Sequence, residues 1–243
     1  KFVLPVLKKF KVNGIFYVPT LNYSKKKILD VHKIHLILGV YGATKSYEIL
    51  NKYISKDMID RKFEKYYKNF FYKTQSNHKL QEIFKYTLNF MIKQSCKDFL
   101  INKIFRYFFN NDETKIFNQY YLSKKNISSL VKNHMVIGSH GVTHTLLTRL
   151  SENQIKKEIN DGFKFVKQYT DLKTFCFPYG GKKSYNRIII NHLKKKKVNF
   201  SFSVENRDIS NLDLKKNRQI LPRYDCNRFP FGGITTNKYS RSK

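Results

Sequence analysis

Cysteine and long apolar runs are scarce in this chain of 243 residues. The three cysteines, Cys96, Cys176 and Cys226, are far apart, which excludes a disulfide framework and a C-x-x-C metal knuckle. No apolar run approaches the roughly 20 residues that a membrane-spanning helix requires. The most apolar stretch, 99–109, is interrupted by a lysine and an arginine. The sequence therefore predicts no transmembrane segment.

Acidic residues are also few: the chain has 17 Asp and Glu against 48 Lys and Arg, which gives a formal net charge of +31. Apolar residues still make up 41% of the chain, which is enough for a core and argues against intrinsic disorder. The lysine excess accompanies abundant Asn, Ile, Phe and Tyr, a usage that A/T-rich codons produce. The basic residues are spread along the chain, whereas nucleic-acid binders often gather them on one element. We therefore expect no nucleic-acid partner, and a basic surface for a glycan or another polyanion is the alternative.

Strands and helices are predicted to alternate at both ends of the chain. A helix over 2–10 precedes a short apolar strand at 15–18, which Pro19 closes. Ser151 and Gln154 form a capping box that predicts the start of a helix. This alternation predicts an α/β fold with a mainly parallel sheet. Further strands are predicted at 135–139, 174–177, 200–204 and 219–221, and a further helix at 185–197.

Residues 24–133 have a different pattern, with few glycines, no proline and apolar residues at helical spacing. We interpret them as a largely helical insertion within a single domain that spans 1–243. One predicted apolar stripe runs through Val31, His35 and Leu38. This stripe favours a core position for His35 over a second metal site.

Two histidines follow the strand predicted at 135–139. His140 and His144 lie four residues apart in the segment Gly-Ser-His-Gly-Val-Thr-His. Parallel α/β folds collect functional groups at the carboxyl ends of their strands, and imidazole nitrogens bind zinc and similar divalent ions. The spacing alone is also typical of two ordinary polar histidines at a strand end.

A turn with proline and glycine follows the strand predicted at 174–177. Its sequence is Phe-Pro-Tyr-Gly-Gly, formed by Pro178, Tyr179 and Gly180 with their neighbours. Proline fixes the chain, and glycine allows the backbone to approach a ligand closely. Taken alone, the segment favours a plain strand-to-helix turn.

The order of these motifs resembles the polysaccharide deacetylases of carbohydrate esterase family 4. That family has H-(S/T)-x-x-H, then L…LS…E-I, then R-x-P-(Y/F)-G, and here Leu150-Ser151 and Glu158 stand between the two turns. Residues 1–20 are similar to the family's first helix and second strand. The resemblance covers 1–20 and about 134–225, and it implies a distorted (β/α) barrel that carries the helical insertion.

The resemblance also implies a reaction and residues for it. The chain would be a metal-dependent hydrolase that removes N-acetyl or O-acetyl groups from an acetylated polysaccharide or oligosaccharide, acting on carbon–nitrogen bonds other than peptide bonds. His140 and His144 would bind the divalent metal, for which zinc is the first choice. Pro178, Tyr179 and Gly180 would form the substrate groove, with the backbone N–H of Tyr179 binding the oxyanion.

The chain departs from the family pattern in two places. Cys176 stands where the family has the arginine of R-x-P, and Leu221-Pro222-Arg223-Tyr224-Asp225 resembles a late strand end in related deacetylases. We therefore predict a catalytic role for Arg223 or Asp225, with a surface ion pair as the alternative.

The second departure is the family's Asp-Asp motif, which supplies the catalytic base and the third metal ligand. This motif precedes the first helix, so we expect the chain to be a fragment without its first strand, and nearly inactive. A non-catalytic glycan- or polyanion-binding protein on the same fold is the alternative function. The sequence leaves the sugar, the compartment and the oligomeric state open.

Overall fold

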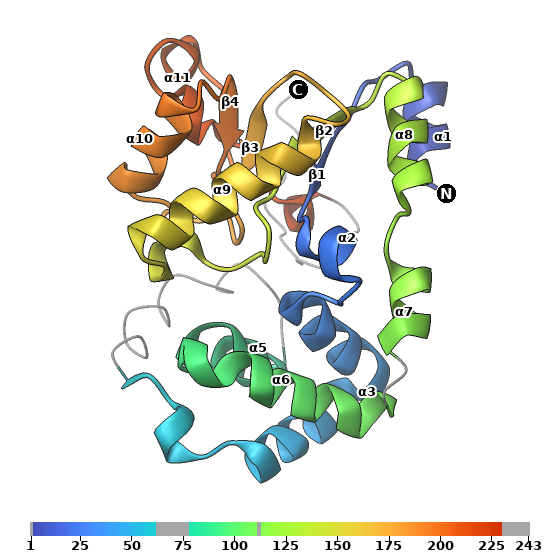
Figure 1. Cartoon of the computed structure of the whole chain (residues 1–243), viewed down its shortest axis with the longest axis vertical. Helices are drawn as coiled ribbons and strands as arrows, with labels where there is room; N and C mark the ends of the chain where they lie inside the picture. The colour runs from blue at the N-terminus through green and yellow to red at the C-terminus, as the bar shows by residue number, and fades with distance from the viewer. Residues whose placement is uncertain (1, 62–77, 111–112, 230–243) are drawn as a thin grey trace, which may run out of the picture. The chain divides into compact units, whose positions relative to one another are not determined.

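The computed structural model describes residues 2–61, 78–110 and 113–229 (Figure 1). The chain divides into two compact units. The first unit comprises Lys1–Lys27 with Thr114–Tyr224, and the second comprises Ile28–Glu113 with Asp225–Lys243. The predicted insertion, 24–133, includes residues 62–77 and 111–112, which lie outside the described part. Its boundaries within a single domain stay a prediction.

The first unit is built on a parallel sheet of four strands in the order β1-β2-β3-β4. Tyr17 pairs with Gly138, and Ser139 pairs with Phe175, so the carboxyl ends of neighbouring strands lie at one edge. The predicted strands at these positions are confirmed, and the one predicted at 200–204 is shorter. The strands are β1 (Ile15–Val18), β2 (Val136–Ser139), β3 (Thr174–Cys176) and β4 (Phe200–Phe202).

The segment after β4 corrects the strand predicted at 219–221. Residues Arg218–Ile220 form a 3-10 turn, and Leu221 makes a single parallel bridge to Phe202. The amide of Leu221 donates to the Ser201 carbonyl at 2.8 Å, which holds the segment along β4. The chain then continues into Arg223, whose carbonyl accepts a hydrogen bond from a backbone amide beyond the end of β4.

Helices cover the sheet of the first unit, and α9 lies across one face of the strands (Figure 1). Ser151 and Gln154 form the predicted capping box at its start. Ile155 and Ile159 of α9 pack in one buried cluster with Phe175 of β3. The helices are α1 (Val3–Lys9), α2 (Leu21–Lys25), α7 (Glu113–Tyr120), α8 (Lys124–Lys132), α9 (Glu152–Val166), α10 (Arg187–Lys195) and α11 (Asn211–Lys216).

The described part of the second unit is helical, and its buried face differs from the predicted stripe. Val31 of the predicted stripe is buried, together with Ile34 and Ile37, whereas His35 is exposed. The reason is Lys33, which is buried because its ammonium group lies 3.0 Å from Glu113 and donates to Asn102. Its helices are α3 (Asp30–Tyr53), α5 (Lys79–Tyr86) and α6 (Gln94–Phe109), with short turns at Lys56–Met58 and Thr87–Met91.

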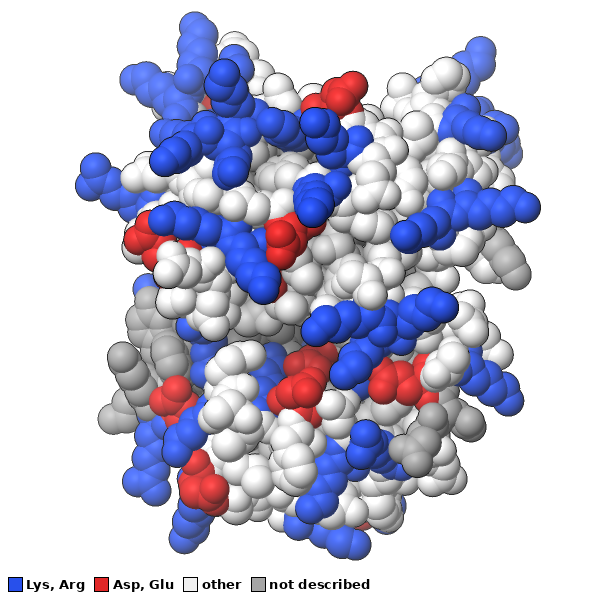
Figure 2. All heavy atoms as spheres, viewed as in Figure 1, with Lys and Arg blue, Asp and Glu red and all other residues white. Residues whose placement is uncertain are grey.

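The described surface carries more basic than acidic side chains (Figure 2), as the composition predicts. Lys and Arg side chains are scattered over the whole visible face in Figure 2, with fewer Asp and Glu among them. None of the described helices is long and apolar enough to cross a bilayer.

Candidate functional site

The His140 ring is fixed by the strands on both sides of β2. Its backbone amide donates to the Val18 carbonyl at 3.1 Å, and its Nδ1 lies 2.6 Å from the Cys176 carbonyl oxygen. A carbonyl oxygen can only accept a hydrogen bond, so Nδ1 carries the hydrogen. In the neutral ring, Nε2 therefore keeps the lone pair that a cation could bind.

The environment of His140 favours that neutral form. Burial lowers the pKa of His140 to about 4, and the positive charge of Arg223 contributes a smaller lowering. The hydrogen bond to the Cys176 carbonyl raises the pKa but does not outweigh burial. At neutral pH the imidazole is uncharged, which is the form that metal ions require.

His144 lies beside His140 in a left-handed backbone conformation, which is uncommon for residues other than glycine. The ring centroids are 4.8 Å apart, with an angle of 77° between the ring planes. The φ angle of His144 is 58°, and this left-handed region costs a non-glycine residue roughly 1–2 kcal/mol. Tyr179 also has a positive φ, 65°, and its ring is 5.2 Å from that of His144. Backbone strain of this kind tends to cluster at functional sites.

The turn that carries Tyr179 depends on the glycine that follows it. Gly180 has a φ of +65°, and a Cβ there would lie 2.3 Å from Val204 Cγ2. The Gly180 carbonyl accepts a hydrogen bond from the Val204 amide at 2.6 Å. Pro178 is buried at the start of the turn. The turn is thus held closely against the segment after β4, with Tyr179 beside His144.

Arg223 lies close to His140 and Cys176. Burial raises the pKa of the Cys176 thiol, and Arg223 opposes that rise through its charge and a hydrogen bond to the side chain. Its charge also acts on His140. The structure therefore brings a guanidinium group to the end of β3, where the strand itself carries Cys176.

Asp225 lies in the second unit, and its described hydrogen bonds are local. Its Oδ1 accepts from the backbone and side-chain nitrogens of Asn227, at 3.2 and 3.1 Å. These bonds cap the 3-10 turn Cys226–Arg228. A catalytic role for Asp225 stays a prediction.

Two polar residues near Cys176 and Arg223, Tyr17 and Thr174, were not predicted from the sequence as part of the site. The hydroxyl of Tyr17 lies 2.6 Å from Thr174 Oγ1, and burial raises the pKa of Tyr17, so it stays protonated. A Cβ on Gly138 would lie 2.3 Å from the Tyr17 ring, so glycine makes room for the ring. The available signal was this glycine inside an apolar strand, which is typical of a close approach.

The histidine pair fits the imidazole part of a divalent metal site. Two adjacent rings, one with a fixed tautomer, offer the nitrogen ligands that zinc prefers. Within the ranges that the structure describes, no group of three or more His, Cys, Asp and Glu side chains could hold a metal ion. The described residues therefore supply two candidate ligands and not a complete set.

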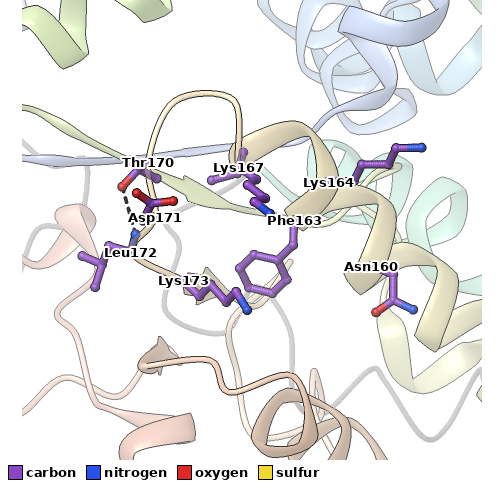
Figure 3. Close-up of a pocket in the computed structure, with 9 residues that line it drawn as sticks. Asn160, Phe163, Lys164, Lys167, Thr170, Asp171, Leu172 and Lys173 are labelled. Atoms are coloured by element: carbon purple, nitrogen blue, oxygen red, sulfur yellow. Dashed lines mark hydrogen bonds between the residues drawn. The ribbon is translucent and has the colours of Figure 1, made fainter.

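A cavity of about 490 Å³ lies in another part of the first unit. It is lined by the C-terminal half of α9 and by residues 170–173. The side chains of Lys167 and Lys173 extend toward the ring of Phe163 (Figure 3). These residues precede β3, whereas the histidine pair follows β2. The cavity therefore lies at the amino ends of the strands, and the histidines lie at the carboxyl ends.

The chain was compared with known protein families, curated proteins and solved structures. Residues 75–201 match the family model described as polysaccharide deacetylase. The match covers slightly more than half of the chain and includes His140, His144 and Tyr179, but neither 1–20 nor Arg223. No curated protein and no solved structure matches the chain.

Proposed function

Because the chain belongs to the polysaccharide deacetylase family, we propose that it is a metal-dependent hydrolase that removes acetyl groups from an acetylated polysaccharide or oligosaccharide. The observation that supports this most is the meeting of His140, His144 and Tyr179 at the carboxyl ends of the strands. In the reaction, water adds to the acetyl carbonyl and the bond from that carbon to the sugar nitrogen breaks. The products are acetate and a free amine, or a free hydroxyl when the acetyl group is an ester.

His140 and His144 would hold the divalent ion, and zinc suits two imidazole ligands. When bound, such an ion lowers the pKa of a water molecule and polarises the acetyl carbonyl. The protein's contribution is orientation, since the bond from His140 Nδ1 to the Cys176 carbonyl keeps Nε2 unprotonated and fixed in direction.

The turn 178–180 would bind the substrate. The ring of Tyr179 packs beside His144 and would form one wall of the groove for the sugar. Its backbone N–H would donate to the oxygen that gains negative charge as water adds, which is the role of an oxyanion hole. Buried Pro178 and tightly packed Gly180 would keep that N–H in place.

Arg223 would orient the carboxylate that acts as the base. A guanidinium group can hold a carboxylate through two parallel hydrogen bonds, and Arg223 lies beside Cys176, where the family pattern has an arginine. We include in the proposal that the base and the third ligand belong to the family's Asp-Asp motif, upstream of the given residues. The proposal also includes closure of the four-stranded sheet into a barrel.

Acetate release from an N-acetylated and an O-acetylated oligosaccharide tests this function. The given chain would be compared with a version that carries the residues encoded upstream. We expect the longer version to be active. His140→Ala should lower its turnover at least about 100-fold, since a bound divalent ion contributes several kcal/mol to the transition state. His134→Asn is the matched control, because His134 is exposed and its left-handed conformation suits asparagine.

Two results would overturn the proposal. Robust and equal rates from both versions would show that the Asp-Asp motif is not required. Unchanged turnover in His140→Ala would exclude the metal role of the pair. Binding of polyanions that falls steeply with salt, with both histidines dispensable, would instead favour the non-catalytic basic protein.

A further inference from the structure

Glu158 of α9 lies against the loop that carries the two histidines, and its side chain is only 9% exposed. Its Oε2 accepts hydrogen bonds from the backbone amides of Val142 at 2.8 Å and Thr143 at 3.1 Å. Its Oε1 accepts from the Thr143 hydroxyl at 2.8 Å. All three donors belong to the two residues that immediately precede His144.

We propose that Glu158 is a positioning residue for the metal-binding pair. Its carboxylate fixes the backbone between the two rings, so that the nitrogens of His140 and His144 converge on one cation. This inference rests on the proposed metal role of the histidines. Glu158 acts through the loop and does not itself contact the cation.

A carboxylate suits this position better than other acceptors. Buried backbone N–H groups need acceptors, and a charged oxygen forms shorter and stronger bonds than a neutral one. A carboxylate cannot donate, so the Thr143 hydroxyl must give its hydrogen to Glu158. Thr143 Oγ1 also lies 2.8 Å from Thr145 Oγ1, so the carboxylate and the two hydroxyls form one small network.

Glycines allow α9 to come close enough for these bonds. Gly162 lies one turn after Glu158, and a Cβ there would be 2.6 Å from Ser139 Oγ and 3.3 Å from the Gly141 carbonyl oxygen. Gly141 has a φ of +75°, and a Cβ on it would be 3.0 Å from Glu158 Oε2. The helix backbone and the loop backbone are therefore in direct contact beside the carboxylate.

The loop is also held from the direction of β1. The amide of Thr20 donates to the Gly141 carbonyl at 3.2 Å, and the amide of Leu21 donates to the Val142 carbonyl at 3.0 Å. These bonds fix the carbonyls of the loop, whereas Glu158 fixes its amides. Removing Glu158 leaves the loop attached on one side, with the segment next to His144 released.

Three substitutions separate positioning from general stability. Glu158→Ala removes all three bonds. Glu158→Gln keeps an oxygen for the two amides, and its NH₂ group can donate to the Thr143 hydroxyl, which then donates to Thr145. Glu152→Gln is the control on the same helix, because Glu152 is exposed and pairs with Lys156 on the surface.

The readouts are hydrogen exchange of the Val142 and Thr143 amides in the metal-free chain, Zn²⁺ affinity by calorimetry, and thermal unfolding. We expect Glu158→Ala to lose protection at both amides and at least about tenfold in Zn²⁺ affinity, the usual cost of losing a group that orients a metal ligand. Glu158→Gln should restore most of both properties, since its neutral oxygen still accepts from the two amides, and Glu152→Gln should change neither.

Unchanged Zn²⁺ affinity in folded Glu158→Ala would overturn the inference, and so would a failure of Glu158→Gln to restore it. If Glu158→Ala does not fold, Thr143→Val removes the hydroxyl bond alone and must still weaken Zn²⁺ binding severalfold. If the version that carries the residues encoded upstream binds no Zn²⁺, while Glu158→Ala loses amide protection, the proposed function is contradicted and the role of Glu158 in holding the loop stays intact.

Discussion

The two ends of the parallel sheet differ in how their polar groups are arranged. At the carboxyl ends, His140 and Tyr179 are held by short hydrogen bonds and close glycine contacts. At the amino ends, Lys167 and Lys173 line a cavity of about 490 Å³, and both are exposed. The histidine pair and Tyr179 therefore lie outside this cavity.

The difference shows that a cluster of polar side chains held in fixed positions locates a candidate active site better than the volume of a cavity does. Orienting a catalytic group costs free energy, which a protein supplies through packing and backbone bonds at that place. Lysines on flexible stems in water carry no comparable restraint. The contrast is testable, because substitutions at the two ends should have unequal effects.

The largest expected effect on stability is that of Gly180→Ala. The new Cβ would lie 2.3 Å from Val204 Cγ2, in a left-handed conformation. We expect a loss of at least about 2 kcal/mol in the free energy of unfolding, measured with urea, since the conformation alone costs about 1–2 kcal/mol. Gly181→Ala is the matched control, because a Cβ there meets nothing within 4 Å. Equal stability of the two variants would contradict the tight packing of the turn.

Arg223→Ala should lower turnover of the active version at least about tenfold, equivalent to 1.4 kcal/mol, with the fold retained. The reason is that Arg223 would no longer orient the base beside Cys176. Arg218→Ala is the control, because Arg218 is exposed and its Nε donates to the Leu214 carbonyl. If both variants keep full turnover, Arg223 has a structural role only.

An ion pair in the segment after β4 gives a pH prediction. Hydrogen bonds from Arg207 and then from Ser210 hold the pKa of Asp213 well below its usual value of 3.8. A pKa lowered by folding stabilises the protein above the unfolded value and loses that contribution as pH falls below it. Asp213→Asn should therefore lower the melting temperature at pH 7, and the difference from the parent should shrink below about pH 4. A difference that stays constant down to pH 2 would argue against this pair.

The smallest effect is expected at the amino ends. The double variant Lys167→Gln, Lys173→Gln should keep the parent's Zn²⁺ affinity and turnover within about twofold, because exposed lysines far from the chemistry contribute little. Calorimetry and acetate release check this. A tenfold loss in either would show that the cavity takes part in the reaction and would remove the contrast between the two ends.

Local sequence patterns predicted much of the first unit. Apolar runs bounded by turn residues located β1, β2 and β3, and Ser151 with Gln154 located the start of α9. The position of His140 and His144 after a buried strand followed from the same pattern. These features depend on neighbouring residues, which a single sequence displays directly.

Features that depend on distant residues could not be predicted in this way. His35 is exposed because Lys33 is buried by Glu113, far along the chain. The approach of Arg223 to Cys176 depends on the segment after β4 following that strand. Neither pairing has a local signal, because the partners are far apart in the sequence, and only the family resemblance suggested a role for Arg223.

The central claim is that His140 and His144 bind one divalent cation, and long-range ¹H–¹⁵N spectra of the seven histidine rings test it most directly. Before metal is added, His140 should show the tautomer with hydrogen on Nδ1, because that atom faces the Cys176 carbonyl. In the version that carries the residues encoded upstream, added Zn²⁺ should shift Nε2 of His140 and one ring nitrogen of His144, and leave the His192 ring unchanged. A His140 ring with hydrogen on Nε2, or Zn²⁺ that shifts neither ring, would contradict the account.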